Sequence, residues 1–91
     1  MNIPQIENMN GHNGSIKNQF IIRMKHKTIF QSYDSVICVI DHKTGTTTLD
    51  RKYWDYSTTT GKYRNIFLGE DKRTTEKKIK SKEYKLKDLN K

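Results

Sequence analysis

The sequence has a single cysteine, a single proline and no long apolar run, and each scarcity excludes a class of protein. With Cys38 alone, no disulfide can form within the chain, which fits a reducing compartment. Because Cys38 lies in the apolar segment SVICVI, we interpret it as a buried hydrophobic residue rather than a reactive thiol. No apolar stretch approaches the length of a membrane span, and the N-terminus lacks the basic and apolar regions of a signal peptide. We therefore expect a cytoplasmic protein.

Polar and charged residues dominate the rest of the chain. Apolar residues make up 32% of the 91 residues, and the mean hydropathy is −0.98. A chain of this kind can bury only a thin core, although its five Tyr, three Phe and one Trp each remove a large area from water. We expect one small folded domain with loose ends.

Positive charge is concentrated in the second half of the chain, and the net charge is +8. Up to Asp50, five Lys and Arg residues face four Asp and Glu residues, whereas from Arg51 onward thirteen face six. This asymmetry indicates a polyanionic partner, such as nucleic acid, an acidic protein surface or an anionic membrane. The alternative is a lysine-rich tail that keeps a small protein in solution.

The pattern along the chain predicts an α+β fold. Residues 1–17 are rich in Asn and Gly, and we expect them to form a flexible N-terminal arm. Residues 18–70 are expected to form the α+β domain, which begins with a roughly four-stranded antiparallel sheet. Its strands are expected in the segments QFIIRMK, TIFQSY and SVICVI and in residues 46–49. In the first of these, the alternation predicts that Phe20, Ile22 and Met24 face the core.

One packed helix is expected to follow the sheet, with Ser57 as its N-cap and Gly69 just past its C-terminal end. The positions predicted for its buried face are Thr59, Tyr63, Ile66 and Phe67. Gly61 lies inside this helix, where it costs about 1 kcal/mol relative to alanine, and that cost suggests the close approach of another group.

Residues 71–91 are expected to form a short basic C-terminal helix and tail. Thr75 is the expected cap of this helix. In the strand-like or irregular tail, Tyr84, Leu86 and Leu89 are expected to make sparse contacts.

One motif is specific enough to suggest a family. Ser32 and Tyr33 end an expected strand, an apolar strand and a glycine turn follow, and residues 56–68 then read Tyr-Ser-x-Thr-Thr-x-Lys-Tyr-x-Asn-x-Phe-Leu. Across roughly residues 19–70 this combination resembles an uncharacterised family of small phage and mobile-element domains. The resemblance implies a phage or mobile-element origin, and therefore action in the host cell cytosol, but it implies no activity.

No catalytic or metal site is predicted. The three histidines lie in the arm and in two turns, without the converging ligands that a metal needs. Asp50 and Asp55 are the only close carboxylates beside the motif, and we interpret them as a strand end and a helix approach rather than as a catalytic pair. Ser57 has no histidine near it in sequence, and no glycine-rich nucleotide loop is present. We expect no enzymatic activity and no cofactor.

Nucleic-acid binding has positive support. Hydroxyls and free backbone amides at the start of the expected helix can hold one phosphate, and Arg64 can hold another or stack on a base. Tyr53, Trp54 and Tyr63 serve either as core residues or as stacking surfaces. The candidate residues for binding nucleic acid or another anion are Ser57, Thr58, Gly61, Lys62, Arg64, Asn65, Lys72, Arg73, Lys77 and Lys78.

The alternative hypothesis is a protein that inhibits or modulates a host protein or defence complex by direct binding, without enzymatic activity. A basic surface with aromatic residues also fits an acidic protein partner. Steep salt dependence would favour nucleic acid, whereas loss of binding on truncation of aromatic residues would favour a protein partner. Neither hypothesis involves a membrane.

Overall fold

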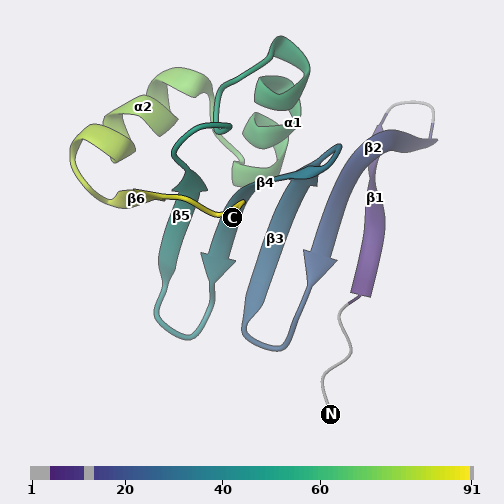
Figure 1. The fold of residues 1–91 in the computed structure, drawn as a ribbon, viewed down its shortest axis with the longest axis horizontal. Helices are drawn as coiled ribbons and strands as arrows, with labels where there is room; N and C mark the ends of the chain where they lie inside the picture. Colours follow the sequence, from purple (N-terminus) through teal and green to yellow (C-terminus); the bar gives the residue numbers. More distant parts are fainter. Residues whose placement is uncertain (1–4, 12–13, 91) are drawn as a thin grey trace.

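The computed structural model describes residues 5–11 and 14–90 of the chain. In this part of the chain one six-stranded sheet carries two helices (Figure 1). The elements in chain order are β1 (Gln5–Gly11), β2 (Gly14–Arg23), β3 (Lys27–Ser32), β4 (Ser35–Asp41), β5 (Thr46–Asp50), α1 (Thr58–Leu68), α2 (Lys72–Lys80) and β6 (Tyr84–Lys87).

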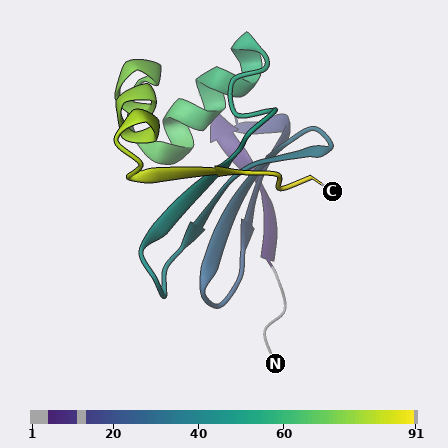
Figure 2. The same cartoon turned by 60° about the vertical axis from the view of Figure 1, so that its left-hand side comes forward.

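The strands lie across the sheet in chain order from β1 to β6. Strands β1 to β5 pair antiparallel, whereas β6 pairs parallel with β5. A parallel pair needs a long crossover, and here α1 and α2 supply it. Both helices lie at the end of the sheet where β5 leads into α1, and the β2–β3 and β4–β5 turns lie at the other end (Figure 1 and Figure 2).

The core lies between the helices and one face of the sheet. Phe30, Cys38 and Leu49 are fully buried and are direct neighbours in register across β3, β4 and β5. Phe67 of α1 stacks on Phe30 with ring centroids 5.6 Å apart. The expected burial of Cys38 is confirmed, and burial raises the pKa of its thiol above the ordinary value.

The predicted four-stranded antiparallel sheet is wrong, because the sheet has six strands and is mixed. One added strand is β1, which with the start of β2 occupies the described part of the segment expected to be an arm. Its residues are mostly polar, but an edge strand is held by backbone pairing, and Met9 packs into the core. Residues 1–4 and 12–13 of the expected arm lie outside the described residues.

The second added strand is β6, in the segment expected to be a tail with sparse contacts. Tyr84 is buried there and Leu86 packs against the core, while Lys85 and Lys87 are exposed. This is period-two alternation, but only over four residues, which is too short to predict a strand on its own. The backbone pairing with β5, and not the local sequence, therefore determines that residues 84–87 form a strand.

The predicted core face of β2 is also wrong. Ile21 packs against the core, because its register places it opposite Phe30, whereas Met24 is 42% exposed. Apolar residues occupy both faces of this strand, so alternation alone did not select the buried one. The strands predicted in SVICVI and at residues 46–49 correspond to β4 and β5.

The ends of α1 are confirmed, and its predicted buried face is confirmed at Tyr63 and Phe67 but is wrong at Thr59 and Ile66. The Ser57 hydroxyl accepts a hydrogen bond from the backbone N–H of Thr60, and Gly69 has a φ of 71° at the C-terminal end. Ile66, predicted to be buried, is 55% exposed. Thr60, Gly61 and Arg64 of this helix are buried, and Tyr63, Phe67 and Leu68 pack against the core.

The second helix begins earlier than predicted. Asp71, not Thr75, caps α2 by accepting a hydrogen bond from the backbone N–H of Thr74. Thr75 is instead buried inside the helix, where its hydroxyl donates to Glu70 over 2.6 Å. The helix therefore starts at Lys72 and brings that lysine beside the start of α1.

Candidate functional site

A buried carboxylate at the end of β5 shapes the approach to the site. Asp50 is 2% exposed, and it accepts hydrogen bonds from the backbone N–H groups of Lys52, Tyr53 and Leu89. Burial by itself raises the pKa of Asp50, but the bonds from Leu89 and Tyr53 outweigh burial and hold the pKa below its usual value. The turn after β5 is therefore fixed, and it carries Trp54 to a place above the core.

The centre of the site is a buried arginine. Arg64 of α1 is 1% exposed. Its Nη1 donates to the carbonyl of Trp54 over 2.6 Å and to Oδ1 of Asp55 over 3.1 Å, and its Nη2 donates to Oδ1 of Asn65 over 2.9 Å. The guanidinium also lies over the Trp54 ring, 5.1 Å from the centroid. These contacts join the β5–α1 loop to the inner side of the helix.

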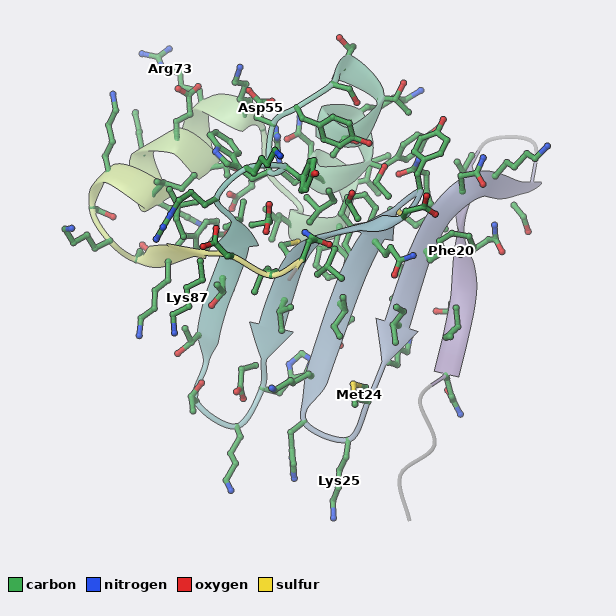
Figure 3. All side chains as sticks on the ribbon, viewed as in Figure 1. Phe20, Met24, Lys25, Asp55, Arg73 and Lys87 are labelled. Carbon is green, nitrogen blue, oxygen red and sulfur yellow. The ribbon has the colours of Figure 1, made fainter. Side chains whose placement is uncertain are left out.

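Asp55 connects this arginine to the second helix. While Oδ1 faces Arg64, Oδ2 lies 2.7 Å from Nζ of Lys72, the first residue of α2. Burial raises the pKa of the Asp55 carboxyl, and the hydrogen bonds from Lys72 and Arg64 lower it by more, so the pKa lies below its usual value. Figure 3 shows Asp55 between the two helices. The carboxylate of Asp55 thus joins the β5–α1 loop to both helices.

Gly61 lies against the buried arginine in the wall of the site. A Cβ added at Gly61 would lie 3.6 Å from Oδ1 of Asp55 and 3.7 Å from both Nη atoms of Arg64. The close approach that the sequence predicts at Gly61 is therefore that of the paired Arg64 and Asp55 side chains. Next to it, the hydroxyl of Thr60 lies 3.0 Å from that of Ser32, which holds the first turn of α1 on β3.

These groups surround a depression of about 670 Å³ at the start of α1. The residues that line it are Asp55, Tyr56, Ser57, Thr58, Gly61, Lys62, Arg64, Asn65 and Lys72. All seven predicted anion-binding residues from Ser57 to Lys72 are in that set, so the structure brings them together. The remaining three predicted residues, Arg73, Lys77 and Lys78, lie farther along α2.

The predicted residues differ in how far their side chains are already engaged. Ser57 caps α1, Asn65 accepts from Arg64, and Arg64 itself is buried rather than exposed toward a phosphate. Lys78 donates to Glu70 over 2.8 Å and contacts the Tyr84 hydroxyl at 3.4 Å. In contrast, Thr58, Lys62, Arg73 and Lys77 are exposed.

Two residues of the depression were not predicted as site residues, namely Asp55 and Tyr56. The available signal was their position just before the N-cap, since residues there lie at the same end of the helix as its first turn. Of the aromatic residues that were left open between core and surface, Tyr53, Trp54 and Tyr63 are partly buried against the core. Tyr56, by contrast, is 45% exposed at the rim.

The described part of the chain contains no group of three or more His, Cys, Asp or Glu residues arranged to hold a metal ion. None of the helices within residues 5–11 and 14–90 is long and apolar enough to cross a membrane. The arrangement at the start of α1 is a concave surface around a buried arginine, lined by Lys62 and Lys72.

A family model described as a family of unknown function (DUF8033) matches residues 1–85. No curated protein and no solved structure matches the chain. The expected resemblance to an uncharacterised family is confirmed at this level, and the match is longer than the expected segment of residues 19–70.

Proposed function

Because the chain belongs to the family of unknown function DUF8033, we propose a function from its own residues. The protein binds nucleic acid through the backbone phosphates, using the start of α1 together with α2 and β6. It acts by binding and not by catalysis. Its role is that of a small basic phage or mobile-element protein in the host cell cytosol, a proposal supported by the motif at residues 56–68 and by the single cysteine.

One observation carries this proposal: the basic side chains of the second half are largely free of internal partners. Among the described residues from Arg51 onward, eight exposed cations form no ion pair. They are Lys52, Lys62, Arg73, Lys77, Lys80, Lys82, Lys85 and Lys87. Apart from Lys52 in the β5–α1 loop, they belong to α1, to α2, to β6 or to the turn between the last two.

The nearby acidic residues do not cancel this charge, because most of them are engaged inside the protein. Asp55 pairs with Arg64 and Lys72, Glu70 pairs with Lys78, and Asp71 caps α2. A surface whose cations are free and whose acids are engaged attracts a polyanion, and a phosphate backbone is the commonest polyanion in a cell. In Figure 3 Arg73 points away from α2 into solvent, and Lys87 extends from β6.

The role of Arg64 within this proposal differs from that of the lysines. Since three of its donor contacts are internal, its main effect is to position the β5–α1 loop against α1. The side chains proposed to meet the backbone phosphates first are Lys62, Arg73 and Lys77, with Thr58 beside them at the start of α1. Contacts of this type fix orientation and affinity without reading sequence.

The test is fluorescence anisotropy with single-stranded DNA, double-stranded DNA and single-stranded RNA, titrated through salt. A triple variant, Arg73→Ala, Lys77→Ala and Lys80→Ala, is compared with a control that removes the same charge elsewhere. That control is Lys17→Ala, Lys25→Ala and Lys43→Ala, three exposed lysines of the β2 strand and the two hairpin turns.

The α2 triple variant is expected to lower the slope of log affinity against log salt by about 2, because each lost phosphate contact removes about 0.7 to 0.9. The control variant is expected to keep the wild-type slope. Equal losses in both variants would contradict a localised binding surface. Absence of binding at low salt would overturn the nucleic-acid proposal and favour the alternative, a modulator of a host protein.

A further inference from the structure

We propose that the depression at the start of α1 is a subsite for a phosphate monoester dianion. This chemistry is that of a terminal phosphate on a nucleic acid or of a free phosphorylated small molecule. The terminal-phosphate case rests on the proposed function, whereas the free-molecule case does not. Such a subsite binds a group of defined charge through defined donors at the start of α1, whereas the exposed lysines attract any phosphate backbone.

Unused donors on the buried arginine are the first support. A guanidinium has five N–H donors, and three hydrogen bonds account for both donors of Nη1 and one of Nη2 in Arg64. Nε has no partner within the described residues, although the side chain is only 1% exposed. A buried polar group without a partner is costly, and a ligand oxygen is one means of removing that cost.

The missing side chain at Gly61 is the second support. An added Cβ there would lie 3.6 Å from Oδ1 of Asp55 and 3.7 Å from both Nη atoms of Arg64, so Gly61 brings its backbone close to the guanidinium and to the carboxylate that pairs with it. A ligand oxygen that follows the path beside Gly61 can move closer to the guanidinium, to the hydrogen-bond distance of about 2.8 Å that charged partners adopt. Gly61 is also buried in the wall of the depression, where a methyl group would occupy this path.

The charge of the lining selects among phosphates. Lys62, Arg64 and Lys72 contribute three positive charges and Asp55 one negative charge, which leaves two positive charges around the depression. A phosphate monoester carries about −1.5 to −2 at pH 7, whereas a backbone phosphodiester carries only one negative charge. The lining therefore matches a terminal phosphate better than an internal one.

The first turn of α1 adds neutral donors. Ser57 caps the amide of Thr60, and the amide of Gly61 donates to the carbonyl of Ser57, which leaves the amides of Thr58 and Thr59 without an acceptor in the helix. Helix α1 has 11 residues, so its N-terminus carries a helix dipole that favours an anion. Tyr56, 45% exposed at the rim, offers a surface for the group that carries the phosphate.

Asp55 occupies the same cations that the ligand would use. Its two oxygens lie 3.1 Å from Arg64 and 2.7 Å from Lys72, so it is the anion already present at the site. A bound phosphate shares these cations with Asp55 and is repelled by it. Replacing Asp55 by Asn is therefore expected to strengthen phosphate binding, although it weakens the folded state.

The experiment uses the full chain and three probes: a 5′-phosphorylated oligonucleotide, the same oligonucleotide with a 5′-hydroxyl, and phenyl phosphate. Trp54 is the only tryptophan and lies 5.1 Å from Arg64, so its fluorescence reports occupancy directly. The 5′-phosphorylated strand is expected to bind about tenfold more tightly, the effect of one charge-assisted hydrogen bond or more. Since the second phosphate pKa is about 6, this preference is expected to shrink at pH 5.5.

Two variants test the placement of the subsite. Gly61→Ala closes the path to Arg64, and Lys62→Met removes a charge from the lining, so each is expected to abolish most of the preference for the 5′-phosphate. Lys43→Met, in the β4–β5 turn at the other end of the sheet, is the matched control and is expected to retain the preference. Thermal unfolding of each variant shows whether the fold is intact.

The outcomes separate the subsite from the proposed function. Equal affinity for both oligonucleotides, with no response of Trp54 to phenyl phosphate, would overturn the subsite and leave nucleic-acid binding intact. Binding of phenyl phosphate without binding of either oligonucleotide would support the subsite, identify a small molecule as the source of the phosphate and overturn the proposed function. A preference retained in Gly61→Ala would overturn the path through Arg64.

Discussion

The hydroxyl of Tyr84 in β6 donates a 2.9 Å hydrogen bond to the carboxylate of Glu70 in the turn between the two helices. The same carboxylate accepts from Thr75 over 2.6 Å and from Lys78 over 2.8 Å, and its side chain is 8% exposed. One buried acid thus joins the helix pair to the last strand of the sheet, at the end of the molecule where the proposed binding surface lies.

Tyr84→Phe is expected to lower the free energy of unfolding by about 1 to 2 kcal/mol, because it removes one donor from a buried charged acceptor. Denaturant unfolding measures this change. Tyr33→Phe is the matched control, since Tyr33 is 47% exposed and its hydroxyl has no partner in the described part of the chain. Similar losses in both variants would show that the hydroxyl of Tyr84 contributes nothing specific.

Acid is expected to destabilise the protein through Glu70. Burial raises the pKa of Glu70, but the bonds from Lys78, Thr75 and Tyr84 lower it by more, so the folded pKa lies below the usual value. The unfolded chain therefore binds the proton more tightly than the folded chain, and stability falls as pH falls below about 4.3, the unfolded pKa. Melting temperatures between pH 7 and pH 3 measure this effect.

Glu70→Gln is expected to be less stable than the wild type at pH 7 and to lose part of the pH dependence. Other carboxyls whose pKa values are also lowered supply the remainder of the acid effect, namely Asp41, Asp50, Asp55 and Asp71. An unchanged pH profile in Glu70→Gln would exclude Glu70 as a source of the acid sensitivity.

Arg64→Met is expected to cost about 3 kcal/mol of unfolding free energy, because it leaves Asp55 and the Trp54 carbonyl without a buried partner. Combined with Asp55→Asn, the loss should be smaller than the sum of the two single losses, and the cycle gives a coupling energy of about 1 kcal/mol or more. The exposed pair Arg23 and Glu7, 2.9 Å apart, is the control and should couple by less than about 0.5 kcal/mol.

Two glycines are expected to respond to alanine with opposite signs. Gly61→Ala should stabilise the protein by up to about 1 kcal/mol, because the new Cβ makes ordinary contacts of 3.6 to 3.7 Å and alanine favours a helix. Gly69→Ala should destabilise it by about 1 kcal/mol, because its φ of 71° is strained for any residue with a Cβ. Thermal unfolding distinguishes the two, and a loss at both positions would show that Gly61 has less room than the geometry gives.

The sequence predicted α1 well because its ends are encoded locally. A serine that caps and a glycine that ends the helix lie at fixed distances from its first and last turns, so no distant contact is needed to find them. Strands β1 and β6 depend on partners. Gln5–Gly11 is polar apart from Ile6 and Met9, and its structure follows from backbone bonds to β2.

The sequence predicted which residues line the candidate site, but it did not predict that Arg64 is buried and bonded to the preceding loop. Charged residues are almost always exposed, so Arg64 was expected to point outward. It lies four residues after Thr60 and three before Phe67, on the face that packs against the sheet. Only the return of Asp55 and the Trp54 carbonyl from the preceding loop makes burial of that charge possible, and a helical pattern does not contain this information.

The parallel pairing of β6 with β5 sets an order of events during synthesis. The edge of β5 stays open until Tyr84 and the strand that follows it have left the ribosome, so Leu49 lacks its Leu86 neighbour for that time. At about 5 to 20 residues per second, the segment between Asp50 and Tyr84 takes about two to seven seconds to make. For those seconds the nascent chain presents the unpaired edge of β5 to other chains, which makes this interval the one most prone to misassembly.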